Sequence, residues 1–329
     1  MSMSTALLPN APFATFQGAF EHLLQSLSND GSDVDPVNDA TSSGSQFGTQ
    51  ARGTRELLSC QFVLSDIRSR LIHREGKMVN LSYAVASFLW LMTGARDPEM
   101  ICFYNQHGRS FMEAGKFCCA FGTRIRKAME GDQLEHVIRC LANDRSSRRA
   151  TISVFSPNDL ITSPRDTPCL LALHYFIRSD TLVCVTTMRS QSAAAIMPYD
   201  VFVFTMLHEY LAIRIGVRPG DYIHSSNTLH YYADEQATVD AILAHRGRVS
   251  PQAMPLMPDE FVNELHLLLN MEEIMRLRIA SDPTASAKDL FSGLSEYSRN
   301  LLAILTSGAR KANGVLSRAD DAPLPRWSF

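Results

Sequence analysis

The stretch from residue 198 to 216, PYDVFVFTMLHEYLAIRIG, constrains the fold more than any other part of the chain. It begins with a proline, which is favoured in the first turn of a helix, and it ends at a glycine, which commonly stops one. Between these two residues it is apolar on nearly every side, a pattern typical of a fully buried helix. We therefore predict a central buried helix over 198–216.

Other segments predict a sheet and further helices around that central helix. Runs of β-branched and other apolar residues, separated by turn residues, indicate strands at 57–64, 150–155, 169–177 and 181–188. Apolar spacing indicates further helices at 12–28, 80–94, 258–278 and 286–307, with Asn80 as the cap and Gly94 as the stop of the second. The predicted fold class is α+β, a mostly antiparallel sheet packed against helices on one face.

The chain divides into three parts by composition. Residues 29–51 are rich in Ser, Asp and Gly and predict a flexible loop. We expect an N-terminal helix and loop (1–51), a core (52–250), and C-terminal helices with an irregular tail (251–329) that pack on the core.

The overall composition indicates a soluble globular protein. Of the 329 residues 45% are hydrophobic and 20% charged, and the net charge of −3 provides no electrostatic reason to expect nucleic acid or a membrane surface as a partner. No apolar run approaches the roughly 20 residues that cross a bilayer, and the first residues lack the features of a signal peptide. The seven cysteines form no CxxC pair, so we expect a cytoplasmic protein with mostly buried free thiols and no metal site.

The residues around one cysteine indicate a reactive thiol. Cys169 follows Pro168 at the start of a predicted strand, and positive charge near a thiol favours the nucleophilic thiolate. Arg148, Arg149 and Arg189 have no acidic run beside them, which suits a phosphate. Taken singly, the cysteine is a core residue and each arginine a solvated surface charge. Only the combination favours an anionic substrate.

Eight segments together resemble a known family, the thymidylate synthase superfamily, and within it the pyrimidine nucleotide (dCMP/CMP) 5-hydroxymethylase branch. The resemblance runs from about Arg52 to Tyr232, with the segments in the family's order and Cys169 at the family's intervals from the later motifs. The segments are ARGTRELLSCQF, NLSYAVASFLWLMTG, CAFGTRI, NDRSSRRATISVF, DTPCLLALHYF, MRS, PYDVFVFTMLHE and GDYIHSSNTLHYY.

The resemblance implies an activity, a cofactor and an assembly. It implies a catalytic core that transfers a one-carbon unit from 5,10-methylenetetrahydrofolate to C5 of a pyrimidine nucleoside monophosphate. It also implies a homodimer whose sheet faces meet across a twofold axis and whose active sites are shared. The resemblance implies that Cys169 is the nucleophile and that His230 and Tyr232 bind the sugar. It implies that Arg52, on a mobile loop, binds the phosphate together with Arg189 and Ser190. It implies that Arg148 and Arg149 bind the phosphate in the partner subunit's site.

Asp200 bears on the choice of base. The resemblance implies Asn at this position in members that use uracil nucleotides and Asp in those that hydroxymethylate cytosine nucleotides. A carboxyl group can accept from the cytosine N4 amine and, when protonated, donate to N3. Alternatively, Asp200 only caps the helix that it opens. Ser190 favours dCMP over CMP, because the resemblance implies Ala there in a ribonucleotide user.

Several family positions are altered, and most of them concern the folate. Ser87 stands where the resemblance implies a catalytic Glu; it can bond water but cannot act as a base near neutral pH. Phe121 replaces a Tyr, Met188 a Gln, Ser192 the Asp that bonds the pterin, and Ile196 a Gly. Three interpretations remain: folate use in a reshaped pocket, folate-independent C5 chemistry that uses Cys169, or a non-catalytic nucleotide-binding protein.

Overall fold

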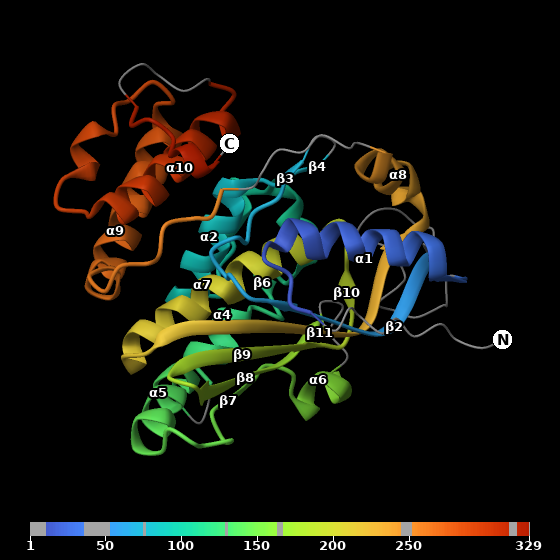
Figure 1. Ribbon diagram of the computed structural model, residues 1–329. Coiled ribbons are helices and arrows are strands. Elements are labelled where there is room, and N and C mark those ends of the chain that lie inside the picture. Colours follow the sequence, from blue (N-terminus) through green and yellow to red (C-terminus); the bar gives the residue numbers. More distant parts are fainter. Residues whose placement is uncertain are drawn as a thin grey trace.

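A seven-stranded sheet forms the centre of the computed structural model, which describes residues 11–35, 53–74, 77–128, 131–162, 167–244, 252–315 and 321–328 (Figure 1). The strand order is β1-β2-β11-β9-β8-β7, and β10 pairs with β11. The bounds are β1 Ser32–Val34, β2 Thr54–Leu64, β7 Thr151–Ser153, β8 Leu170–Arg178, β9 Thr181–Met188, β10 Gln191–Ser192 and β11 Arg218–Tyr232.

Most neighbouring strands in this sheet are antiparallel. Only β9 with β11 and β10 with β11 run parallel. Two small hairpins stand apart from the sheet: β3 (His73–Arg74) with β4 (Lys77–Met78), and β5 (Met112–Glu113) with β6 (Lys116–Phe117). The predicted α+β class with a mostly antiparallel sheet is confirmed.

The predicted central helix is α7, Met197–Ile215, and it is buried along most of its length. Pro198 lies in its first turn, and Gly216 ends it in the left-handed conformation with φ 75°. α7 packs against β9 and β11 on one side and against α2 (Leu81–Thr93) on the other. Asn80 caps α2 and Gly94, with φ 65°, ends it, as predicted. α7 therefore lies between the centre of the sheet and α2.

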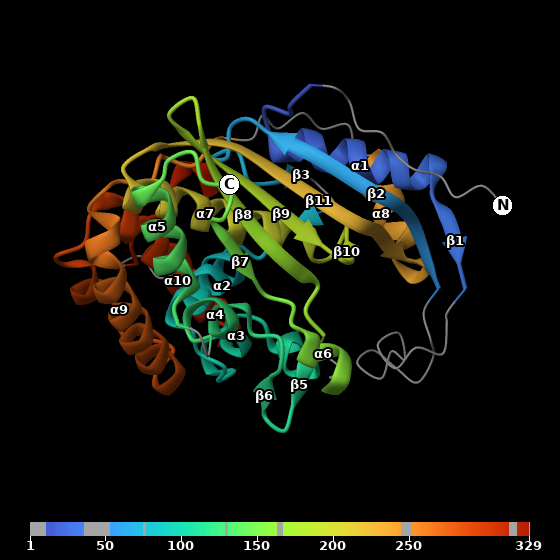
Figure 2. The same ribbon diagram turned by 90° about the horizontal axis from the view of Figure 1, so that it is seen from below.

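The helices leave one face of the sheet uncovered. In Figure 2, strands β2, β11, β9 and β8 lie in front of the helices. Residues along β9 alternate between buried and half-buried, so that Val183, Val185 and Thr187 lie on the face away from α7. An apolar, half-exposed sheet face is therefore left on the described protein.

The remaining helices surround this core. α9 pairs with α10, and α10 packs on α2, as Figure 1 shows at the upper left. None of the described helices is long and apolar enough to span a membrane. The bounds are α1 Phe16–Asp30, α3 Glu99–Tyr104, α4 Phe121–Arg126, α5 Gln133–Asn143, α6 Pro157–Thr162, α8 Gln236–Ala244, α9 Phe261–Ser281 and α10 Glu296–Ala312, with 3-10 turns η1 Gln106–Phe111, η2 Ala233–Glu235, η3 Lys288–Phe291 and η4 Arg326–Ser328.

Four sequence predictions were wrong in detail. The longest strand, β11, was not predicted, and β1 lies inside the predicted loop at 29–51. The last helix begins at 296 rather than 286, because Gly293 adopts φ 81° and Ser295 caps a new helix after it. Four of the seven cysteines are half-buried rather than buried.

Candidate active site

Cys169 and Arg189 lie side by side where β8 begins and β9 ends. The Arg189 backbone N–H donates to the Cys169 carbonyl at 2.8 Å. The Arg189 guanidinium donates from Nε to the Pro168 carbonyl at 2.9 Å and from Nη2 to the Thr167 carbonyl at 3.0 Å. Its Nη1 group makes no hydrogen bond within the described residues. The arginine thus holds the backbone that carries the half-buried Cys169 thiol and keeps one donor for a ligand.

The positions for which the sequence predicts contact with the sugar and the folate meet on the next strands. Ser192 of β10 is the parallel partner of His230 on β11, and the Ala193 N–H donates to the His230 carbonyl at 2.7 Å. The His230 and Tyr232 rings lie edge to face at 5.3 Å. Ser192 is buried, and its Oγ has no hydrogen-bond partner within the described part of the chain. Ser190, half-buried, lies just before this pair of strands.

Asp200 lies in the first turn of α7, yet its side chain does not cap the helix. Its Oδ2 accepts from Gln191 Nε2 at 2.9 Å, and the start of α7 has no side-chain cap. Burial raises the pKa of Asp200 to about 7, although the bond from Gln191 opposes the shift. Burial therefore favours the protonated carboxyl, and the side chain is directed toward β10 rather than along its own helix.

Behind Gln191 stands a chain of buried polar groups that the sequence analysis did not single out. Gln191 Oε1 lies 3.2 Å from Nε2 of His224, and Nδ1 of His224 lies 2.8 Å from the Tyr222 hydroxyl. Phe62 stacks on the His224 ring at 5.3 Å. Burial lowers the pKa of His224 to about 3, so the imidazole is neutral. The one sequence signal that could have pointed to this group was the position of Gln191 between the predicted site residues Ser190 and Ser192.

The α2 side of the site presents Tyr83 rather than Ser87. The Ser87 hydroxyl donates back to the Tyr83 carbonyl, one turn earlier in the helix, at 2.7 Å. The Tyr83 ring lies edge to face with Tyr199 at 5.0 Å. Burial, and next the charge of Asp200, raise the pKa of Tyr83 to about 12. Tyr83 is a second site residue that the sequence analysis missed.

Apolar side chains stand at two further altered positions, 121 and 196. Phe121 begins α4, and its ring lies 6.2 Å from that of Phe204, one turn along α7 from Asp200. Ile196, just before α7, is 43% exposed. Position 121 therefore offers a phenyl ring where the resemblance implies a tyrosine hydroxyl, and position 196 offers an aliphatic side chain where it implies a glycine.

Two of the predicted phosphate ligands, Arg148 and Arg149, lie away from Arg189 within one chain. Arg148 and Arg149 are exposed and precede β7, where Thr151 pairs with His174. His174 is five residues along β8 from Cys169, roughly 16 Å at about 3.3 Å per residue. Neither arginine makes an ion pair within the described residues. Arg52 lies outside the described residues.

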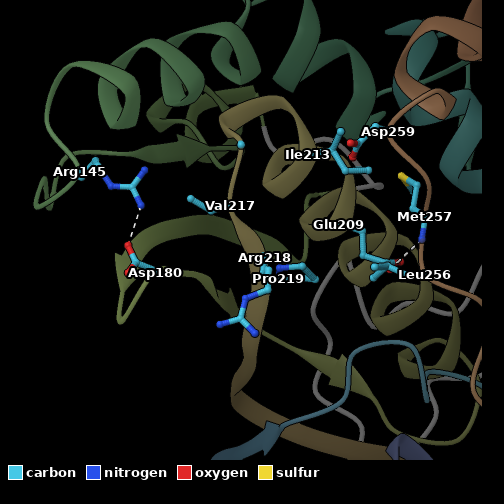
Figure 3. A pocket seen from close by; sticks show the side chains of 11 residues that line it. Arg145, Asp180, Glu209, Ile213, Val217, Arg218, Pro219, Leu256, Met257 and Asp259 are labelled. Carbon is cyan, nitrogen blue, oxygen red and sulfur yellow. Dashed lines mark hydrogen bonds and ion pairs between the residues drawn. The ribbon is translucent and has the colours of Figure 1, made fainter.

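A separate cavity of about 590 Å³ lies at the opposite end of the sheet (Figure 3). Its lining includes Arg145 and Asp180, which pair at 3.0 Å, and Arg218. Arg218 is level with Thr181, at the far end of β9 from Arg189. None of the predicted site residues lines this cavity. The candidate site is therefore the group of polar residues around Cys169 and Asp200.

Known proteins resemble the chain in both fold and sequence. The structure of thermostable thymidylate synthase A from Bacillus subtilis matches it with a TM-score of 0.62 at 18% identity, over 76% of this chain and 91% of that chain. A putative thymidylate synthase from Methanococcoides burtonii is 31% identical over 132 residues, which are 40% of this chain and 60% of the relative. The deoxyuridylate hydroxymethyltransferase of Delftia phage PhiW-14 is 26% identical over 208 residues, 58% of this chain and 57% of the relative.

The chain thus spans about three fifths of the length of these two curated relatives. The family model described as Thymidylate synthase matches residues 34–269, well over half of the chain. The matched range carries every strand of the central sheet from β2 to β11 and the group around Cys169 and Asp200. The resemblance inferred from the motifs is confirmed, and the chain belongs to the thymidylate synthase family.

Proposed function

We propose that this protein is a pyrimidine nucleotide C5 hydroxymethyltransferase that acts on a cytidylate, with dCMP preferred over CMP. The observation that carries the choice of base is the Asp200 carboxyl, whose Oδ2 accepts from Gln191 Nε2 at 2.9 Å, in surroundings where burial raises its pKa. The phage relatives are named for deoxyuridylate, so the preference for cytosine rests on this residue and not on the comparisons.

Cys169 provides the nucleophile in this proposal. Its Sγ adds to C6 of the pyrimidine, and the electron pair of the C5–C6 double bond moves toward N3 and makes C5 nucleophilic. Methylenetetrahydrofolate, when bound, supplies the one-carbon unit that C5 takes up. Loss of the C5 proton together with departure of tetrahydrofolate, which breaks its bond to the one-carbon unit, would leave an exocyclic methylene. Water adds to that methylene, and departure of the Cys169 thiolate restores the C5–C6 double bond.

Asp200 assists the first of these steps. A protonated carboxyl donates to N3 of cytosine, while its second oxygen accepts from the N4 amine. Transfer of that proton toward N3 stabilises the negative charge that thiolate addition places on the ring. Arg189, whose Nη1 group is available, would bind the nucleotide's phosphate beside the nucleophile.

The residues at the altered positions fit a folate in part. The buried Ser192 Oγ has no hydrogen-bond partner among the residues that the structure describes and can bond one polar atom of a pterin ring. Phe121 and Ile196 offer apolar surface to a flat ring. A hydroxyl makes fewer bonds than the carboxylate that the resemblance implies at 192. These three residues would hold the folate, so we include methylenetetrahydrofolate in the proposal.

We also propose that the active form is a homodimer. The half-exposed Val183, Val185 and Thr187 form an apolar face of the kind that a second subunit covers. The exposed Arg148 and Arg149 would then reach across the twofold axis to the phosphate in the partner subunit's site. Their separation from Cys169 within one chain supports this arrangement.

Two measurements on dCMP, CMP, dUMP and UMP test the proposed function. Mass spectrometry should find one added hydroxymethyl group on dCMP in the presence of methylenetetrahydrofolate. Release of tritium from C5-labelled dCMP should disappear in Cys169→Ser and persist in Cys140→Ser, which changes another half-buried cysteine. Tritium release without folate would favour folate-independent chemistry, and no release from any nucleotide would leave only a binding protein.

A further inference from the structure

We propose that Gln191, His224 and Tyr222 act as one positioning unit, the Asp200 relay, which fixes the oxygen of Asp200 that carries the proton and thereby sets the pairing with the base. The inference deepens the proposed function and rests on it for the identity of the ligand. It starts from three consecutive polar contacts, 2.9 Å from Gln191 to Asp200, 3.2 Å from His224 to Gln191 and 2.8 Å from Tyr222 to His224.

With Asp200 ionised, only one set of hydrogen-bond directions satisfies all three contacts. An ionised Asp200 can only accept, so the Gln191 amide must present its NH₂ to Oδ2 and its Oε1 to His224. His224 must then carry its proton on Nε2, which leaves Nδ1 to accept from the Tyr222 hydroxyl. Each group therefore donates toward Asp200, and the direction of the whole chain is determined.

The relay is rigid, because each member is buried and on a strand. Gln191 is 2% exposed, His224 1% and Tyr222 0%. β10 carries Gln191 and pairs with β11, which carries the other two. The Phe62 ring covers one face of the imidazole. To reverse its amide in this enclosed position, Gln191 would need His224 to change tautomer and the acid proton of Asp200 to move to Oδ2 at the same time, or buried donors and acceptors would be left unpaired.

The relay assigns different roles to the two oxygens of Asp200. Oδ2 is an acceptor, because Gln191 donates to it, so the proton of the neutral acid resides on Oδ1. Oδ1 makes no hydrogen bond within the described residues. With the donor on Oδ1 facing N3 and the acceptor Oδ2 shared with the N4 amine, the carboxyl matches cytosine. Uracil, with a donor at N3 and an acceptor at position 4, requires the opposite order.

The groups around Asp200 leave this assignment undisturbed. Tyr83 of α2 and Tyr222 of β11 are close enough to Asp200 to feel its charge. Burial is the main cause that raises the pKa of both hydroxyls, and the charge of Asp200 adds to it, so both hydroxyls stay neutral. His224 is neutral as well. From its own helix the neighbouring Tyr199 is also uncharged, since burial raises its pKa. The relay is thus a set of neutral dipoles that all point toward the carboxyl.

The first test measures the titration of Asp200 in the unliganded protein. Carbon-13 NMR of aspartate-labelled protein, with the signal assigned by its loss in Asp200→Asn, should show a midpoint near 7. Gln191→Met should raise that midpoint by about one pH unit, the size expected for one hydrogen bond to a charged group. Tyr222→Phe should raise it less, and Gln61→Met, at an exposed glutamine of β2, should leave it in place. An unmoved midpoint in a folded Gln191→Met protein would overturn the relay, whatever the protein binds.

The second test uses nucleotide binding and separates the relay from the proposed function. Calorimetry on the wild type should show dCMP affinity falling as pH rises through about 7, with dCMP bound more tightly than dUMP. In Gln191→Met the fall should move to higher pH and the preference for dCMP should shrink about tenfold, the effect of one lost polar contact. A wild type that binds no pyrimidine nucleotide would sink the proposed function and the base-pairing role together. If Gln191→Met binds dCMP with the wild-type pH profile and the wild-type preference over dUMP, the relay alone would be contradicted.

Discussion

Replacing Asp200 by asparagine should stabilise the fold, and by more at high pH than at low pH. Burial raises the pKa of Asp200 from its ordinary value of 3.8 to about 7 in the folded protein. Between these values the unfolded chain has lost the proton and the folded chain retains it, so wild-type stability falls as the pH rises. The full loss is about 4 kcal/mol, of which about 2.5 kcal/mol falls between pH 5 and pH 8.

The assay compares free energies of unfolding at the two pH values. Urea titrations of the wild type and Asp200→Asn at pH 5 and pH 8 give four numbers, and their double difference isolates Asp200 from other titrating groups. The advantage of the variant should grow by about 2.5 kcal/mol at the higher pH. Asp221→Asn, at an exposed aspartate, should show no such growth. An advantage that stays constant or shrinks with pH would refute the argument that Asp200 is held in an unfavourable environment for its charge.

Three further predictions concern packing, assembly and chemistry. Gly122→Ala should lower the free energy of unfolding by about 1–3 kcal/mol, seen as a drop in Tm, because the new Cβ would lie 2.4 Å from the Leu91 carbonyl oxygen. Mixing inactive Arg149→Ala protein with inactive Cys169→Ser protein should restore activity, since a mixed dimer has one intact shared site; no recovery would contradict sharing. Ser87→Glu should raise folate-dependent turnover by restoring a proton-transfer group, whereas lower turnover would favour folate-independent chemistry.

The sequence predicted best where one local pattern decides the structure. α2 was bounded correctly because Asn80 and Gly94 mark its ends, and 181–188 was predicted as the strand that it forms. β11 was missed because its middle, His224 to Thr228, is polar and carries no apolar alternation. His224 and Ser226 of this stretch are buried only because strands from distant parts of the chain flank β11 on both sides.

In the candidate site, too, the contacts between neighbouring strands could be predicted and the contacts between distant segments could not. Cys169 and Arg189 could be placed together from motifs, because β8 and β9 form a local hairpin whose ends meet. The contact between Gln191 and His224 joins residues 33 apart through a parallel register that no local signal encodes. The direction of the Ser87 hydroxyl, back toward its own helix, likewise depends on helix geometry and not on residue type.

The central position of β11 also has a consequence for how the chain assembles during synthesis. β2 pairs along its length with β11, Thr54 with Tyr232 and Leu64 with Tyr222, so its partner emerges from the ribosome more than 150 residues later. Until then the edge of β2 that faces β11 is unpaired, while the hairpin of β8 and β9 can already form from neighbouring residues. Closing so long a loop is slow, and an exposed apolar strand invites pairing with other chains in the meantime. We expect refolding yields to depend on protein concentration, with the β8–β9 hairpin protected from hydrogen exchange before β2.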